Sequence, residues 1–166
     1  MLTENKIIDM HSHFVPEVYA RALKKHNALL EDSFPTPEWD AKSHLHFMDQ
    51  AGIAWSLLSL SSPQPYFGDP LESCRLCREI NEYGVSVKKE YPDRFGYAAC
   101  LPLPDVSGAL DEAKYALEVL GADAIKLASN SRGLYLGEEA MEPLFQYLND
   151  QDAIVIIHPH RPEPLK

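Results

Sequence analysis

Residues 6–13 read KIIDMHSH, an apolar run that ends in two histidines one residue apart. The run predicts a buried β-strand whose last residues are polar. Side chains alternate across a strand, so His11 and His13 project from the same face, about 7 Å apart along the backbone. Neutral imidazole is a common ligand of zinc and other transition metals. The stretch therefore predicts a strand that presents two metal ligands at its end.

A second apolar run lies near the other end of the chain. Residues 153–157 read AIVII and are followed by His158, Pro159 and His160. Parallel strands joined by helical crossovers place their carboxyl ends on one rim, where α/β folds build their sites. This second pair of histidines therefore offers a third ligand for the same ion. The alternative is that either pair is an exposed polar edge or a satisfied buried pair.

The remaining histidines and the cysteines lack such a setting. His44 and His46 lie in a helical stretch, and with His26 they are interpreted as helix-surface or packing residues. The three cysteines are an odd number, and reduced thiols are expected. Cys74 and Cys77 form a CxxC inside a helical pattern without the second CxxC of a four-ligand zinc site, so we assign them no function.

The composition is that of a folded globular protein. The 166 residues are 45% hydrophobic and 24% charged, enough apolar content for a core. The formal net charge of -10 and the pI near 5.1 disfavour binding to phosphate backbones and anionic lipid. The chain shows no signal-peptide pattern and no apolar run near the roughly 20 residues that span a bilayer. We expect no nucleic acid or membrane partner and a cytoplasmic location.

Apolar runs alternate with helical patterns along the whole chain. The expected strands are residues 6–10, 53–60, 95–101, 122–127 and 153–158, and the expected helices are residues 16–27, 38–50, 70–90, 107–120 and 138–149. This order implies a parallel sheet with right-handed crossovers, as in a (β/α)₈ barrel or a doubly wound sheet. The polar stretch 61–69 is long for a simple connection and is a candidate substrate loop.

Several short motifs occur in the order that is typical of one family. They are DMHSH at 9–13, FMD at 47–49, GI at 52–53, LSSP at 60–63, FGD at 67–69, DRFG at 93–96, LPLPD at 101–105, GAD at 121–123, YLG at 135–137 and HP at 158–159. Over essentially its whole length the chain resembles the N-terminal part of the amidohydrolase-2 group of metal-dependent amidohydrolases. That group includes aminocarboxymuconate-semialdehyde decarboxylase and related decarboxylases.

The resemblance implies a (β/α)₈ barrel with the HxH on its first strand and a further histidine ligand ending the fifth. By position these ligands are His11, His13 and His158, and they would hold one divalent ion, Zn²⁺ with Mn²⁺ as the alternative. Such barrels typically need about 250 residues. We therefore expect residues 1–166 to form a single incomplete barrel domain of about five βα units. The family's other catalytic histidine and its metal-binding aspartate are expected beyond the chain end.

An incomplete barrel leaves strand edges unpaired and an apolar interior open. Either the chain is a fragment of a longer enzyme, or another copy of the chain closes the open side. Because exposed strand edges and apolar surface favour association, a homo-oligomer is expected. For the complete protein the resemblance favours a metal-dependent non-oxidative decarboxylase of a small cyclic or unsaturated carboxylic acid. A hydrolase of an amide, ester or lactone shares the ligand set and is the first alternative. A non-catalytic metal-binding or self-associating fragment is the second.

Further polar residues follow the expected strands and would face the same rim. The candidates for holding the substrate are Ser61, Asn130, Arg132 and His160. Arg132 is a natural partner for a substrate carboxylate, because a guanidinium pairs with it bidentately; a solvated loop arginine is the alternative. In some superfamily relatives a carbamylated lysine bridges two metals, and Lys126 lies on the corresponding strand. The alternative is a lysine whose stem packs in the barrel while its amine reaches the rim.

Overall fold

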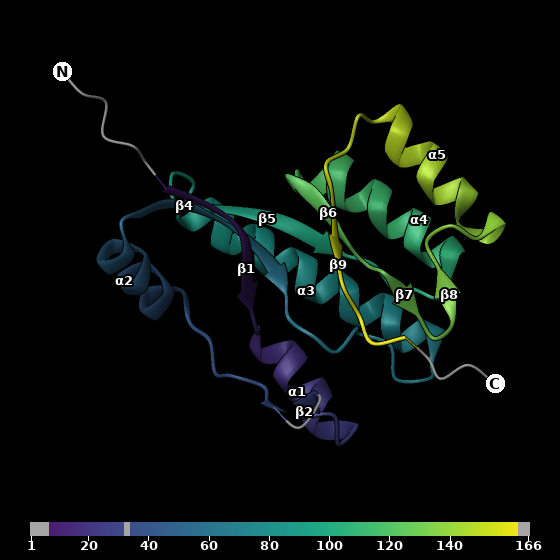
Figure 1. Cartoon of the computed structure of the whole chain (residues 1–166), viewed down its shortest axis with the longest axis horizontal. Helices are drawn as coiled ribbons and strands as arrows, with labels where there is room; N and C mark the ends of the chain where they lie inside the picture. The colour runs from purple at the N-terminus through teal and green to yellow at the C-terminus, as the bar shows by residue number, and fades with distance from the viewer. Residues whose placement is uncertain (1–6, 32–33, 163–166) are drawn as a thin grey trace.

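The computed structural model describes residues 7–31 and 34–162 (Figure 1). Its centre is a five-stranded sheet in the order β1-β4-β5-β6-β9, and each pairing is parallel. The strands are β1 (Ile7–Phe14), β4 (Ile53–Leu60), β5 (Phe95–Cys100), β6 (Ala124–Ala128) and β9 (Val155–His158). The alternating βα order that the sequence predicts is confirmed. The strand start expected at Lys6 lies outside the described residues.

Helices connect the successive strands of this sheet. They are α1 (Glu17–Lys25) and α2 (Ala41–Ala51) before β4, α3 (Pro70–Glu90) before β5, α4 (Val106–Lys114) with the π-helical turn η1 (Tyr115–Leu120) before β6, and the 3₁₀ turn η2 (Glu139–Met141) with α5 (Glu142–Asp150) before β9. The bounds of α3 are those predicted, because the Asp69 carboxylate caps the Leu71 N–H at 2.9 Å and Pro70 suits the first helical position. Helix α2 begins three residues after its predicted start at residue 38, because Asp40 is its capping residue.

Two short antiparallel ladders are not predicted by the sequence. They are β2 (Leu30–Glu31) with β3 (Phe34–Pro35), and β7 (Asn130–Ser131) with β8 (Leu134–Tyr135). The second ladder is closed by two residues, Arg132 with φ of 52° and Gly133 with φ of 84°. Positive φ at both positions is the geometry of a type I′ turn, whose twist matches that of a hairpin. This hairpin follows the carboxyl end of β6 directly.

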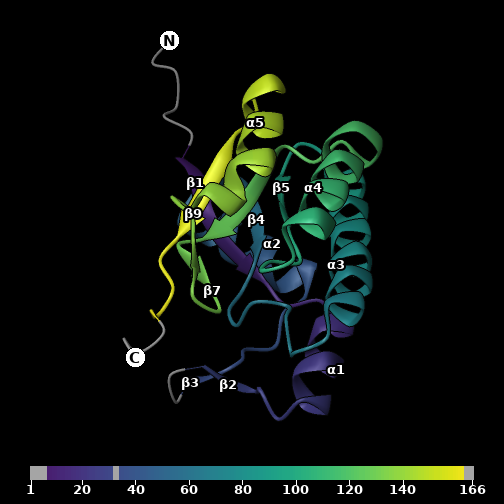
Figure 2. The same cartoon turned by 90° about the vertical axis from the view of Figure 1, so that its right-hand side faces the viewer.

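The helix-covered face of the sheet holds the core. Helices α3 and α4 lie side by side along this face (Figure 2). Ile80 of α3, Ala113 of α4 and Tyr97 of β5 are fully buried in one hydrophobic cluster. Burial of this apolar surface, at about 25 cal/mol per Å², is the main stabilising contribution of the face.

A buried polar cluster ties these three elements together. The Asn81 amide nitrogen on α3 donates to the Cys100 carbonyl at 2.9 Å and to Glu112 Oε1 at 2.7 Å. The Asn81 amide oxygen accepts from the Tyr97 hydroxyl at 2.8 Å and from the Cys100 N–H at 3.0 Å. We call Asn81, Tyr97, Cys100 and Glu112 the Asn81 cluster. Its amide has internal partners at both ends, as buried polar groups require.

The outer strands are more exposed than the sequence predicts. Ile8 on β1 is 60% exposed and Ile157 on β9 is 57% exposed. Within the part of the chain that the structure describes, β1 and β9 each have a neighbouring strand on one side only. The prediction that these two apolar runs form buried strands is therefore wrong at Ile8 and Ile157, because the outer sides of β1 and β9 are uncovered.

The sheet is strongly curled. In a flat sheet β1 and β9, four strand spacings apart in the sheet order, would lie about 19 Å from each other. The imidazole rings of His11 on β1 and His158 on β9 nevertheless have centroids 5.0 Å apart. The curl turns the carboxyl ends of the two edge strands toward each other, so that histidine side chains from both strands meet.

The structure bears on two further expectations. Cys74, Cys77 and Cys100 are free thiols. No helix among the described residues is both long and apolar enough to cross a membrane. That residues 1–166 form a single domain stays a prediction.

Candidate metal centre

Three imidazoles from the carboxyl ends of β1 and β9 meet, and we call His11, His13 and His158 the histidine triad. The Nε2 atoms of His11 and His13 are 3.0 Å apart. One ligand nitrogen from each triad residue lies within 4.8 Å of the other two. Zinc–imidazole bonds of about 2.0–2.1 Å place two nitrogens of one ion at most about 4.2 Å apart, so a shift of about 1 Å would bring all three onto one ion.

A β-bulge in β1 lies at the first of these rings. The partner of Asp9 on β4 is Ser56. The partner of Ser12 is Leu58, so β1 has one residue more than β4 over this stretch. The His11 N–H donates to Asp9 Oδ1 at 2.9 Å within the irregular segment. Bulges re-aim side chains and are frequent beside active sites, and this one lies at the first triad residue.

Hydrogen bonds orient two rings of the triad. Ser59 Oγ donates to the Ser12 carbonyl at 3.3 Å and lies 3.2 Å from His13 Nδ1, so this Nδ1–H donates to Ser59. His158 Nδ1 lies 2.7 Å from the Pro159 carbonyl, which can only accept, so this ring also carries its proton on Nδ1. Metal-binding histidines usually donate their second N–H in this way. In both rings Nε2 is then the unprotonated, ligand-type nitrogen.

His44 supports the HxH segment from α2. Its Nδ1 accepts from Trp39 Nε1 at 2.9 Å, so its Nε2 carries the proton and donates to Ser12 Oγ at 3.1 Å. Burial lowers the pKa of His44, which favours this neutral form. Its contacts agree with the interpretation as a packing residue. The sequence does not reveal that His44 positions Ser12, the residue between His11 and His13, because this contact joins distant parts of the chain.

Burial and a neighbouring cation keep triad residues neutral. Burial, and after it the positive charge of Lys126, lowers the pKa of His13 to about 4. The same two causes lower the pKa of His158. Metal binding requires the neutral imidazole. Both rings are therefore in the ligand form at neutral pH.

Lys126 on β6 is a half-buried residue whose ammonium lies close to the triad. Its Nζ donates to the Leu60 carbonyl at 2.6 Å, and burial lowers its pKa to about 8. In the described ranges, no carboxylate forms an ion pair with it. A buried ammonium without an anionic partner is costly. An anion bound next to Lys126 would therefore be stabilised.

The four candidate substrate-binding residues occupy three different settings. Ser61 lines a cavity of about 280 Å³ together with two residues of the histidine triad. Arg132 and His160 line a neighbouring cavity of about 260 Å³. Asn130 is buried, and its amide nitrogen donates to the His160 carbonyl at 3.1 Å. The structure thus brings Ser61 to the triad, places Arg132 and His160 in the next cavity, and uses the Asn130 amide to hold the segment after β9.

The chain has relatives among known proteins. Residues 8–165 match the model of a family described as Amidohydrolase. Decarboxylase yanB from Aspergillus niger is 40% identical over 158 residues, which are 92% of this chain and 43% of that protein. The 6-methylsalicylic acid decarboxylase acuB from Aspergillus aculeatus is 31% identical over 160 residues, which are 94% of this chain and 48% of that protein. The chain spans about half the length of these curated relatives.

Solved structures share the fold. A crystal structure of an amidohydrolase II is 42% identical with a TM-score of 0.92, over 97% of this chain and 53% of that one. A dihydroxybenzoic acid decarboxylase from Polaromonas sp. with bound manganese and 2-nitroresorcinol has a TM-score of 0.79 at 21% identity, over 96% of this chain and 51% of that one. The five parallel strands form a half-barrel that matches part of such barrels, and the predicted fold class is confirmed.

Proposed function

This chain belongs to the amidohydrolase family, and from that premise we propose that its histidine triad binds one divalent metal ion, Zn²⁺ or Mn²⁺. We further propose that the complete protein is a metal-dependent non-oxidative decarboxylase of a small cyclic or unsaturated carboxylic acid, in the first place an aromatic one. The observation that carries the proposal is the approach of three ligand nitrogens to within 4.8 Å of one another.

The relatives favour loss of carbon dioxide over hydrolysis. Proteins 40% and 31% identical to this chain are named decarboxylases, and the name of the second gives an aromatic acid as its substrate. A similar fold carries manganese, which supports a divalent ion here. Because the chain covers 43% and 48% of these two relatives, the proposed reaction is that of the whole protein.

The donor set fits a metal ion of the catalytic type. Three neutral imidazoles leave the ion its full charge and open coordination positions. When bound, the ion supplies positive charge that orients a carboxylate or hydroxyl group of the substrate. The residues of this chain prepare that site, because Ser59 and the Pro159 carbonyl hold the Nδ1 protons of His13 and His158.

Two further residues complete the proposed binding site for the acid. Ser61 lines the triad cavity, and it also lines a small cavity of about 20 Å³ with Lys126. We assign Ser61 as a hydrogen-bonding group for the substrate. The buried charge of Lys126 stabilises an anionic ligand at this position, since it has no carboxylate partner among the described residues.

Metal binding is tested on the full chain by titration calorimetry with Zn²⁺ and Mn²⁺. One ion per chain is expected. His11→Asn removes one ligand and should abolish tight binding. His46→Asn is the matched control, because His46 is an exposed histidine on α2 outside the triad. Equal affinities of the two variants for the ion would overturn the metal site.

The reaction is tested on the complete protein loaded with Zn²⁺ or Mn²⁺. Carbon dioxide release is followed with hydroxybenzoates that include 6-methylsalicylate, with pyrimidine carboxylates and with muconate-like acids. Lactones and amides are the hydrolytic controls. Release of carbon dioxide from one of the acids supports the proposal. Turnover of a lactone or amide without carbon dioxide establishes the hydrolase alternative, and metal binding without any turnover establishes the non-catalytic one.

A further inference from the structure

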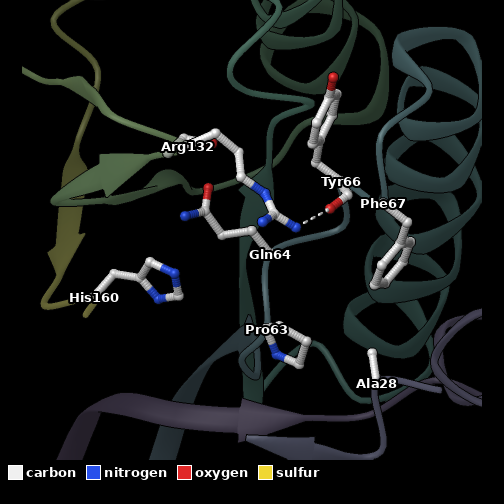
Figure 3. Close-up of a pocket in the computed structure, with 8 residues that line it drawn as sticks. Ala28, Pro63, Gln64, Tyr66, Phe67, Arg132 and His160 are labelled. Carbon is white, nitrogen blue, oxygen red and sulfur yellow. Dashed lines mark hydrogen bonds between the residues drawn. The ribbon is translucent and has the colours of Figure 1, made fainter. Parts of the chain in front are cut away.

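A second cavity, of about 260 Å³, lies beside the triad cavity and shares no lining residue with it (Figure 3). We call it the Arg132 pocket. Its polar wall comes from Arg132, Gln64 and His160, and its apolar wall from Pro63, Tyr66 and Phe67. Figure 3 shows the Arg132 guanidinium reaching across the space between Gln64 and Tyr66, with Phe67 on the side opposite His160.

Arg132 occupies a backbone position that arginine disfavours. It is the first central residue of the two-residue β7–β8 turn, with φ of 52°. Type I′ turns prefer Asn at this position, because its short side chain tolerates the left-handed conformation. An arginine held there against its preference indicates a use for the side chain.

The guanidinium has spare binding capacity. One of its nitrogens donates to the Tyr66 carbonyl at 3.5 Å, the outer limit of a hydrogen bond. No ion pair within residues 7–31 and 34–162 involves Arg132. A guanidinium presents five N–H donors in a planar fork that matches a carboxylate. The formal net charge of the chain is -10, so a local cation is what an anion needs here.

The walls of the pocket are tied together before any ligand arrives. Gln64 Nε2 donates to the Asn130 carbonyl at 2.7 Å, which joins the loop after β4 to the hairpin. The Asn130 amide in turn donates to the His160 carbonyl at 3.1 Å. The Phe67 ring stacks on His26 with centroids 4.5 Å apart. A pocket with fixed walls loses little entropy when it binds a ligand.

We propose that the Arg132 pocket binds an aromatic carboxylate, independently of any metal ion at the triad. The carboxylate lies on the Arg132 guanidinium, and the ring packs against Phe67 and Pro63. The volume of about 260 Å³ is just below the roughly 300–1,000 Å³ of drug-sized sites, which fits a single ring. None of the described residues that line the pocket lies at the start of a helix, where phosphate sites are often built, which favours a carboxylate.

The proposal is tested by NMR titration of the full chain with benzoate in the presence of a chelator. Amide shifts should centre on residues 64, 66, 67, 131, 132 and 160. Arg132→Asn should weaken benzoate binding by about 10-fold or more, because it removes a charge-assisted bidentate pair. The melting temperature of this variant should stay equal or rise, because Asn suits the turn. If the arginine were purely structural, Arg132→Asn would lower the melting temperature and leave benzoate affinity unchanged. Unchanged benzoate affinity would overturn the proposal.

Three further measurements separate the contributions of the charge, the ring and the site. Acetate has the charge without the ring and should bind several-fold more weakly than benzoate; equal affinity would overturn the aromatic part. Inorganic phosphate should not displace benzoate, and tighter binding of phosphate would replace the carboxylate assignment. His11→Asn should leave benzoate binding unchanged. Loss of binding in that variant, or shifts centred on residues 13, 61 and 158, would place the carboxylate at the triad. The benzoate titrations are run without metal, so they remain informative even if the triad does not bind Zn²⁺ or Mn²⁺.

Discussion

The sheet carries two groups of polar side chains. The Asn81 cluster is buried between β5 and the helices α3 and α4, whereas the histidine triad with Lys126 is half-buried or exposed at the carboxyl ends of the strands. In the Asn81 cluster, both the nitrogen and the oxygen of the Asn81 amide form hydrogen bonds within the protein. Glu112 also forms an ion pair with Arg78 at 2.8 Å. In the second, ligand nitrogens face one another, and Lys126 donates to a carbonyl. Polar groups with internal partners stabilise a fold, whereas groups without them gain from a ligand. The first group is therefore structural, and the second fits the binding site that we propose.

The largest expected effect is on the structural side of this comparison. Asn81→Leu should lower the free energy of unfolding by about 4 kcal/mol, because it leaves several buried donors and acceptors unpaired at about 1–3 kcal/mol each. Urea denaturation measures the loss. Gln146→Leu is the control, since it removes only an exposed hydrogen bond to Asp150, and should change stability by less than about 0.5 kcal/mol. A loss below 1 kcal/mol for Asn81→Leu, roughly one net hydrogen bond, would mean that the cluster is not structural.

The triad should show the opposite behaviour. His13→Asn should change the stability of the metal-free chain by less than about 1 kcal/mol, because the ring is only half-buried and makes few internal bonds. The same change should raise the Kd for Zn²⁺ by at least about 100-fold, the upper end of what loss of an outer-shell partner costs. Calorimetric titration measures the Kd. A stability loss comparable with that of Asn81→Leu would instead make the triad a structural element.

Lys126→Met should stabilise the protein. The ammonium is buried with a carbonyl as its hydrogen-bond partner, and methionine fills a similar volume without charge. A pKa about 2.5 below the usual 10.5, at 1.36 kcal/mol per unit, sets an upper limit of about 3.4 kcal/mol at pH 7. We expect a gain of about 1–3 kcal/mol, because methionine also loses the hydrogen bond to the Leu60 carbonyl. Lys88→Met is the matched control, because Lys88 forms an ion pair with Asp123 at 2.6 Å, and it should be neutral or destabilising. Equal effects of the two substitutions would remove the distinction between the lysines.

The pH dependence of stability provides a further test of Lys126. Its folded pKa of about 8 lies below its ordinary value of 10.5, so between these pH values the unfolded chain binds more protons. Stability contributed by this group therefore rises from about pH 8 to about pH 10.5, and the full penalty is present below pH 8. The difference between the wild-type and Lys126→Met curves isolates the effect, because the other titrating groups are common to both. A constant difference across this range would contradict the assignment.

The smallest expected effect on folding comes from the open edges. Ile8→Lys and Ile157→Lys should change stability by less than about 1 kcal/mol, since both side chains are more than half exposed. They should nevertheless weaken self-association of the chain, because charge protects strand edges from pairing. Light scattering measures association. Val119→Lys, an exposed apolar residue of η1 away from these edges, should leave it unchanged. A wild-type chain that is monomeric at high concentration would rule out the expected homo-oligomer.

Much of the scaffold follows from local patterns. The bounds of α3 are predictable because Asp69 and Pro70 form its start, and the five strands are recognisable as apolar runs between helical segments. The β7–β8 hairpin is missed, because Arg132-Gly133 is not the Asn-Gly pair that signals a type I′ turn. The exposure of Ile8 and Ile157 is also missed, because an apolar run has the same sequence whether or not a neighbour covers it.

The sequence by itself determined which residues could bind a metal, since His11, His13 and His158 stand at the ends of recognisable strands. Only the tertiary structure decided that they meet. The β1 bulge lies at the first ring, and Ser59 and the Pro159 carbonyl select the ligand nitrogens of the other two. The curl of the sheet turns the end of β9 toward that of β1, so that their side chains meet. Each of these depends on contacts between segments far apart in the chain. Periodicity and capping are local properties, so they determine elements, whereas the approach of two edge strands depends on the packing of the whole sheet.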